Sequence, residues 1–121
     1  MQDELFIISG IIEDSEGYQV CVSIEPSHPI LKGHFPGHPL VPGVCLLVLF
    51  RRILKNIHHP CEFVLCCDSL KFVKVLSPDL YSNFEVFVVG GSDENERITI
   101  KVKSQEKLFA LFIGRFYKII P

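Results

Sequence analysis

The sequence predicts a single α+β domain in which one antiparallel sheet wraps one central buried helix. Three observations support this fold class. The chain has 121 residues, the size of one ordinary domain, and 48% of them are hydrophobic. One segment near the middle has the composition of a buried helix, and most other segments alternate apolar and polar residues as strands do. We therefore expect residues 1–121 to form one domain around one core.

Two strands are expected before the helix. Leu5–Glu13 is rich in isoleucine, residues 14–17 are typical of a turn, and Tyr18–Ile24 alternates as a returning strand does. The next segment, Pro26–Pro42, contains five prolines and two glycines, which interrupt any regular helix or ladder. Seventeen residues without secondary structure inside a compact domain usually form a functional loop.

The central helix is predicted to follow Pro42, because proline suits the first helical turn, and to end before Pro60. Its first half, Val44–Phe50, is apolar on every face, so we expect that half to be enclosed on all sides. From Arg51 to Ile57 the pattern becomes amphipathic.

Alternating segments fill the rest of the chain and predict the remaining strands. In Tyr81–Val89, for example, Phe84, Val86 and Val88 occupy one face. The other predicted strands are residues 62–75 (one long strand or two short ones), 97–102 and 108–120, with breaks at 77–79, 90–95 and 105–107.

Charge and composition exclude several classes of partner and site. A formal charge of −2 and a pI near 6.2 argue against nucleic acid, and the longest apolar run is too short to cross a bilayer. The first ten residues carry two acids and no basic region, so we expect a cytoplasmic protein whose five cysteines are free thiols. A zinc site is disfavoured because the adjacent Cys66 and Cys67 would point to opposite faces of a strand, and we expect buried or half-buried thiols instead. The other ligand types considered for it are His58, His59 and Cys61.

The loop and the helix start together carry a recognisable motif. Gly33–Val44 reads GHFPGHPLVPGV. It resembles the GHFPGHPxxPGV segment of the FabA/FabZ-type 3-hydroxyacyl-acyl carrier protein dehydratases, which have the hotdog fold. Residues 69–72 and 77–79 also resemble the strand and turn that follow in that family, with Ser77 where proline is more usual.

The resemblance implies a role for each part of the motif. His34 would be the base that removes the α-proton of a 3-hydroxyacyl thioester, since imidazole titrates near neutrality. The backbone N–H of Gly43, at the helix start, would polarise the thioester carbonyl. The substrate loop would be shaped by Phe35, Pro36, Gly37, His38 and Pro42. We expect no metal and no cofactor.

One position departs from the family pattern. The family's catalytic acid lies fourteen residues after the histidine, on the helix, and fourteen residues after His34 is Val48. The helix has no Asp or Glu from Gly43 to His59, and Arg52 stands where the family often has glutamine. Loss of a positioned general acid lowers a rate by about 10²- to 10⁴-fold.

The leading hypothesis is therefore a dehydratase-like subunit that binds or dehydrates 3-hydroxyacyl-acyl carrier protein thioesters, in fatty acid or related polyene or polyketide synthesis. Because Val48 replaces the acid, we expect the dehydratase activity of this subunit to be impaired when no partner chain is present. The subunit would be the histidine-bearing half of a heterodimer, or a relative that binds acyl chains or supports a partner. An acyl-thioester hydrolase and a structural or regulatory domain are the alternatives. A homodimer or heterodimer with the two sheets side by side is expected.

Other residues are assigned ordinary structural roles. Val48 is expected in the core. The rings of Phe35, Phe50, Phe72 and Phe87 could line an acyl tunnel, but a place in the core is preferred. The apolar last strand is expected to contribute to a dimer interface through Phe109, Leu111, Phe112 and Phe116. A solvated basic surface is preferred over a carrier-protein contact for Arg51, Arg52, Lys55, Lys71 and Lys74, and a surface or turn role is expected for His28, His58 and His59.

Overall fold

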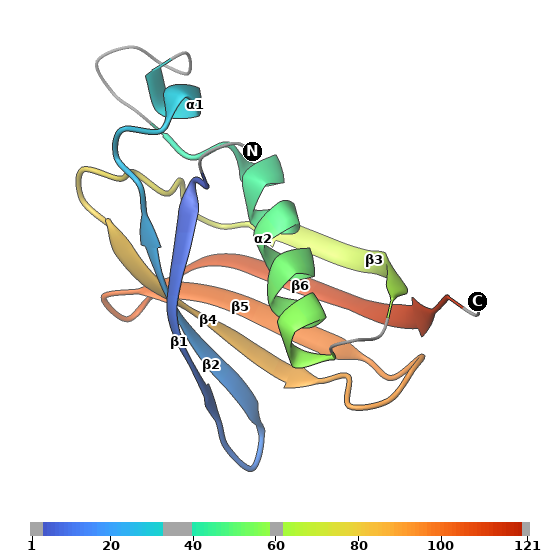
Figure 1. Ribbon diagram of the computed structural model, residues 1–121. Coiled ribbons are helices and arrows are strands. Elements are labelled where there is room, and N and C mark those ends of the chain that lie inside the picture. The colour runs from blue at the N-terminus through green and yellow to red at the C-terminus, as the bar shows by residue number, and fades with distance from the viewer. Residues whose placement is uncertain (1–3, 33–39, 59–61, 120–121) are drawn as a thin grey trace.

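The computed structural model describes residues 4–32, 40–58 and 62–119, which form a six-stranded sheet and two helices (Figure 1). The elements in chain order are β1 (Phe6–Glu13), β2 (Gly17–Ile24), α1 (Pro29–Lys32), α2 (Gly43–Ile57), β3 (Phe63–Phe72), β4 (Asn83–Gly90), β5 (Ile98–Ser104) and β6 (Lys107–Lys118). The strand order is β1-β2-β4-β5-β6-β3, and every neighbouring pair is antiparallel. This is the α+β architecture that the sequence predicts.

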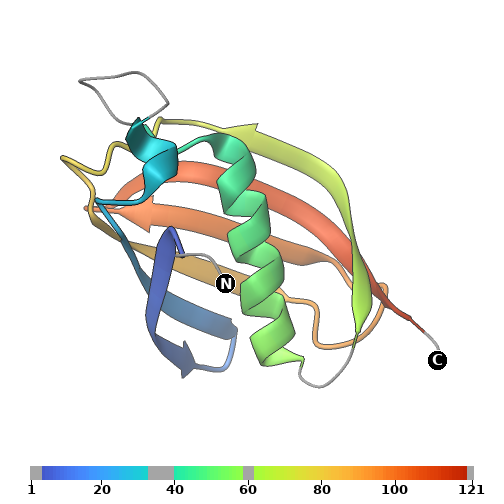
Figure 2. The same cartoon turned by 45° about the horizontal axis from the view of Figure 1, so that its top comes forward.

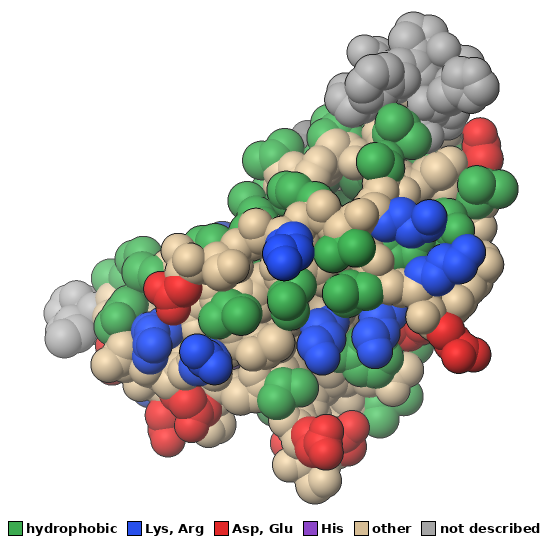
Figure 3. Space-filling view, turned by 180° about the vertical axis from the view of Figure 1, so that it is seen from behind, with side chains coloured by type: hydrophobic (Ala, Val, Ile, Leu, Met, Phe, Trp, Pro, Cys, Tyr) green, Lys and Arg blue, Asp and Glu red, His purple; other side chains and the backbone are tan. Residues whose placement is uncertain are grey.

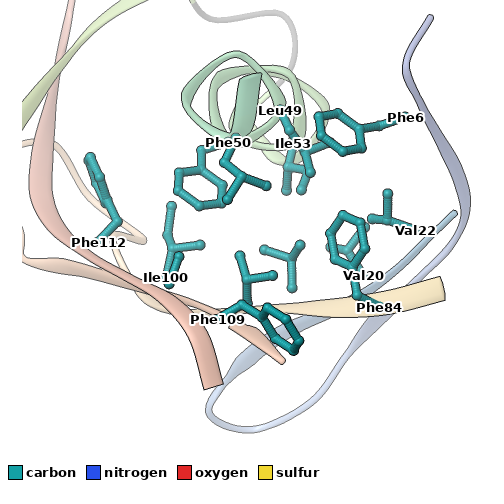
Figure 4. Packing of buried hydrophobic residues seen from close by; sticks show 14 of the residues in the cluster. Phe6, Val20, Val22, Leu49, Phe50, Ile53, Phe84, Ile100, Phe109 and Phe112 are labelled. Carbon is teal, nitrogen blue, oxygen red and sulfur yellow. The ribbon is translucent and has the colours of Figure 1, made fainter. Parts of the chain in front are cut away.

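The helix α2 lies against the concave face of the curved sheet, and the short helix α1 lies beyond its N-terminal end (Figures 1 and 2). The side chains between helix and sheet form the core, in which Leu49, Phe50 and Ile53 of α2 point toward the sheet (Figure 4). Phe50 is fully buried and its ring centroid lies 5.8 Å from that of Phe112 on β6. One side of α2 therefore packs against the sheet and forms the core with it.

Alternation in β4 places Phe84, Val86 and Val88 in this core, as predicted. For residues 62–75 the sequence allows one long strand or two short ones. The structure has the single strand β3 there, and its register with β6 shifts between Cys67 and Ser69. Cys66 is half-buried, whereas the neighbouring Cys67 is exposed, because β3 is an edge strand with an uncovered side. The prediction of a buried or half-buried thiol is thus wrong for Cys67.

The proline-rich segment contains regular structure that the sequence analysis missed. Residues Pro29–Lys32 form α1, where Pro29 occupies the first helical position. The Nδ1 atom of His28 accepts a hydrogen bond of 3.1 Å from the Ile30 N–H, so His28 caps this turn. Leu31 is buried and anchors the turn to the core. The proline-rich segment therefore contains one short helix as well as irregular chain. Residues 33–39 lie outside the described part of the chain.

The first half of α2 is not enclosed on all sides, contrary to the prediction. Val44 and Val48 are 63% and 67% exposed, so Val48 is not a core residue. The reason is geometric: the sheet covers one side of the helix, and within the described residues nothing covers the opposite side at these two positions. The buried residues of α2 are Leu46, Leu49, Phe50, Ile53 and Leu54.

Two of the four phenylalanines expected in the core are elsewhere. Phe72, at the end of β3, is 50% exposed, and Phe87 lies on the outer face of β4 because it alternates with the buried Val86 and Val88. Phe50 is in the core as predicted. Phe35 lies outside the described residues.

The rings of the apolar last strand belong to the core of the chain itself. β6 lies between β5 and β3 in the sheet, and Phe109, Phe112 and Phe116 are buried, whereas Leu111 is partly exposed. The predicted contribution of this strand to a dimer interface stays a prediction. The sheet's two edges are β1 and β3.

The outer face of the sheet mixes basic and hydrophobic side chains (Figure 3). One row across it, set by strand register, contains Lys71, Leu111, Lys101 and Phe87. The lysine stems can cover apolar surface while their ammonium groups remain in water, so this composition is typical of a solvated sheet face. No helix in the described ranges is long and apolar enough to cross a membrane.

His58, which follows α2, is half-buried and not a simple surface residue. Its ring centroid is 4.6 Å from that of Phe116, and its backbone N–H donates to the Leu54 carbonyl at 2.9 Å. Burial first, and the positive charge of Lys118 second, lower the pKa of His58 below its ordinary value. His58 therefore links the end of the helix to β6 in its neutral form.

The core contact of α2 predicts a large stability difference between two aromatic positions. Phe50→Ala should lower the free energy of unfolding by about 3–5 kcal/mol, because it leaves a cavity between helix and sheet. Phe87→Ala, on the outer face, should lower it by about 1 kcal/mol or less. Urea denaturation measures both, and equal losses would contradict the assignment of the two faces.

The lowered pKa of His58 predicts a pH dependence of stability. The unfolded chain binds this proton more readily than the folded chain, so the stabilisation is present above about pH 6.5 and is lost as the pH falls toward the folded-state pKa. The urea midpoint of the wild type should therefore fall relative to that of His58→Phe as the pH is lowered from 7.5. A constant difference between the two proteins across the pH range would show that His58 does not titrate in this way.

Candidate functional site

The start of α2 is held in place by backbone contacts. The Val41 N–H donates to the Leu76 carbonyl at 2.9 Å, and the Cys45 N–H donates to the Pro42 carbonyl at 3.0 Å. Pro42 is the N-cap residue in an extended conformation and provides no side-chain hydrogen bond to the first turn. The N–H of Gly43, the first helical residue, is therefore one of the donors that a helix start leaves without an intrahelical acceptor.

A close contact explains why residue 43 is glycine. A Cβ atom there would lie 2.7 Å from Cζ of Phe72, closer than two carbon atoms can pack. Phe72 thus covers one side of the helix start, where a cavity of about 350 Å³ opens between α2 and the end of β3. The cavity is lined by Gly43, Val44, Phe72, Lys74 and neighbouring residues. The sequence analysis preferred a core position for Phe72, since an aromatic residue at strand spacing is usually core.

A second cavity, of about 270 Å³, lies beside Val48, the position predicted for the family's acid. Cys45, Val48, Leu49 and Arg52 of α2 line one side of it. The other side is lined by Glu4, Leu5, Phe6, His28 and Ile30. Val48 contributes only methyl groups, so the wall is apolar at the position where a carboxyl group would be expected from the family resemblance.

Arg52 connects this cavity to the segment that enters β1. Its Nη1 atom donates to the Phe6 carbonyl at 2.8 Å, and its Nη2 atom lies 3.2 Å from Oε1 of Glu4. The sequence analysis predicted that Arg52 belongs to a solvated basic surface. These two contacts show that this prediction is wrong. Glu4 provides the cavity's carboxylate, and sequence reasoning missed it because forty-eight positions separate it from Arg52.

Cys45 also lines this second cavity, but its thiol is not activated. Burial raises the pKa of Cys45, which favours the protonated thiol over the nucleophilic thiolate. A nucleophilic role for this cysteine is therefore disfavoured.

Gly43 and Val48 line different cavities. They are five residues apart on α2, a rise of about 7.5 Å, and they face different sides of the helix. Pro42 lies at the helix start. The remaining predicted site residues, His34, Phe35, Pro36, Gly37 and His38, lie outside the described residues, and their roles stay predictions.

The other basic residues expected on a solvated surface divide into two groups. Arg51 donates to the Phe63 carbonyl at 3.1 Å and its guanidinium lies 4.9 Å from the centroid of the same ring. Lys55 pairs with Glu62 at 3.4 Å. Lys71 and Lys74 are exposed, so the prediction of a solvated basic residue agrees with the structure at these two positions.

Comparison with known families decides the identity of the fold and the motif. The ApeI-like family model, described as ApeI dehydratase, matches residues 11–112. The chain belongs to the ApeI-like dehydratase family. This confirms the resemblance to the FabA/FabZ-type hotdog dehydratases, on which the site assignments depend.

Curated relatives of this ApeI-like chain include 3-hydroxyacyl-[acyl-carrier-protein] dehydratases FabZ. The Thermotoga neapolitana enzyme is 30% identical over 93 residues, which cover 69% of this chain and 65% of that relative. The Thermotoga petrophila enzyme is 28% identical over 110 residues, which cover 86% of this chain and 80% of the relative. The family is therefore supported along most of the sequence.

Solved structures show the same fold. The dehydratase heterocomplex ApeI:P from Xenorhabdus doucetiae matches with a TM-score of 0.70 and 18% identity, covering 92% of this chain and 96% of that chain. An uncharacterized protein from Erwinia carotovora subsp. atroseptica matches with a TM-score of 0.68 and 14% identity, covering 95% of each chain. The ApeI-like chain thus has the hotdog fold.

The contact between Gly43 and Phe72 predicts a specific coupling. Gly43→Ala should push the Phe72 ring aside and lower the free energy of unfolding by about 1 kcal/mol. In the Phe72→Ala background the same change should be neutral or stabilising, because alanine favours helix over glycine. A double-mutant cycle in urea measures the coupling. Additive effects would mean that the ring does not restrict residue 43.

Proposed function

We propose that this chain is a dehydratase-type hotdog subunit that binds 3-hydroxyacyl groups carried as thioesters on acyl carrier protein, and that it releases water efficiently only when a partner chain supplies the acid. The observation that carries the proposal is Val48. It lies on the uncovered side of α2, beside a cavity, at the position where the family has its carboxylic acid.

The chemistry requires two proton transfers. His34 would take the α-proton, while the Gly43 N–H would stabilise the charge that develops on the thioester oxygen. The β-hydroxyl must then leave as water, so the departing oxygen needs a proton as the carbon–oxygen bond breaks. Hydroxide is a poor leaving group, and the α2 helix has no carboxyl group to protonate it. This chain alone therefore provides the base without the helix acid.

A second hotdog subunit would complete the site. The strand β3 forms ladder hydrogen bonds to β6 on one side only, which leaves one edge free for another sheet. Val44 and Val48 form an exposed apolar surface on the neighbouring helix, as expected for a surface that is covered in an assembly. The similar fold in the Xenorhabdus doucetiae heterocomplex supports pairing with a different subunit.

The cavity at the helix start suits the thioester end of the substrate. Gly43 and Lys74 both line it, so an unsatisfied helix donor and a cation lie close to one opening. Lys71 and Lys74 are exposed near this end of β3, where they would meet the phosphate of the carrier's pantetheine arm. The proposed carrier-protein contact thus involves these two lysines, while Arg51, Arg52 and Lys55 make contacts within the chain.

The missing acid predicts a gain of function. Wild-type chain alone should dehydrate a 3-hydroxyacyl pantetheine thioester at least about 100-fold more slowly than Val48→Glu, because the new carboxyl group can protonate the leaving oxygen. Burial in an assembled site would help to keep that group protonated. Mass spectrometry follows the loss of one water from the thioester.

Val44→Glu is the matched control, since it adds a carboxyl group one turn earlier on the same exposed side of α2. It should not increase the rate. If wild type alone already turns over at about 1–10³ per second, the missing-acid argument is wrong. Release of free thiol in place of water would identify a thioester hydrolase.

A further inference from the structure

The cavity beside Val48 has a mostly apolar wall that contains the charged pair of Glu4 and Arg52. His28 also lines it, and its Nδ1 atom accepts the hydrogen bond from the Ile30 N–H. Leu5, Phe6, Ile30, Val48 and Leu49 provide hydrophobic lining. Glu4 and Arg52 lie 3.2 Å apart at the wall, with side chains 59% and 34% exposed, so both can reach a molecule in the cavity. A ligand that fills this space would be largely hydrocarbon with one small polar group.

The chemistry of the pair indicates which polar group fits. A carboxylate only accepts hydrogen bonds, and a guanidinium only donates them. A hydroxyl group has one hydrogen to donate and two lone pairs that accept. It can therefore donate to Glu4 and accept from Arg52 at the same time, whereas a carbonyl oxygen can use only Arg52 and a methylene can use neither.

We propose that Glu4 and Arg52 together bind the 3-hydroxyl of the acyl chain, so that a carboxylate from the segment before β1 takes over the recognition function lost at Val48. This inference rests on the proposed function and names the group that recognises its substrate. The pair positions the hydroxyl and supplies no proton. Binding of the hydroxylated chain is thus retained while the acid for dehydration comes from elsewhere.

The position of Arg52 supports this assignment. Its second contact, 2.8 Å to the Phe6 carbonyl, fixes the guanidinium between α2 and β1. This anchor holds the polar pair one helical turn after Val48, on the same cavity. A contact that only joined the two segments would not require the pair to line an apolar space.

The test compares two thioesters that differ by one oxygen, S-(3-hydroxyoctanoyl)pantetheine and S-octanoylpantetheine. Dissociation constants are measured by NMR titration for the wild type and Glu4→Met, which keeps side-chain length and removes both oxygens. We expect Glu4→Met to weaken binding of the hydroxylated thioester about tenfold, as for loss of one hydrogen bond to a charged group. Binding of the saturated thioester should change less than about twofold.

Glu62→Gln is the matched control, because Glu62 also pairs with a basic residue of α2, Lys55, but does not line this cavity. It should leave both dissociation constants unchanged. Arg52→Gln should also weaken the hydroxylated ligand selectively, and urea denaturation verifies that each variant is folded.

Equal weakening of both thioesters by Glu4→Met, or no weakening of either, would overturn the inference while leaving acyl binding intact. If wild type binds neither thioester, the proposed function itself fails. The two failures are therefore distinguishable in one set of titrations.

Discussion

The packing of α2 against one face of the sheet is the constraint on which the rest of the molecule depends. The helix is apolar around its first half, but the sheet can bury only one side of a cylinder. Leu49, Phe50 and Ile53 take that side and form the core with the middle strands. Val44 and Val48 are left on the other side, so the stability of the fold and the exposure of the candidate site have the same geometric origin.

The same helix also separates the site into two parts. Its first residue, Gly43, lies at a cavity with Phe72 and Lys74, where a helix N-terminus favours developing negative charge. Val48 lies at the other cavity, with Glu4 and Arg52. The described residues of one chain therefore place the helix start and Val48 at two cavities on different sides of α2.

Val48, at the position predicted for the family's acid, is apolar, and the charged groups near it come from other residues. With Val48 apolar, the wall contains no helix carboxylate, and Arg52 reaches across to Glu4 and to the Phe6 carbonyl. The cavity thus keeps one negative and one positive group, although neither stands at the family's acid position. The chain belongs to a dehydratase family, and the position predicted for that family's acid is occupied by valine.

Local patterns in the sequence determined the elements of the fold. Strand alternation placed Phe84, Val86 and Val88 correctly, and the motif ending at Val44 predicted the family, because both depend on neighbours in the chain. Tertiary structure alone decided the exposure of Val48 and the burial of the last strand's rings in the core of the same chain. It also decided the contact of Phe72 with Gly43 and the pairing of Glu4 with Arg52. These contacts join residues far apart in sequence, and periodicity within a segment carries no information about which distant segment will cover it.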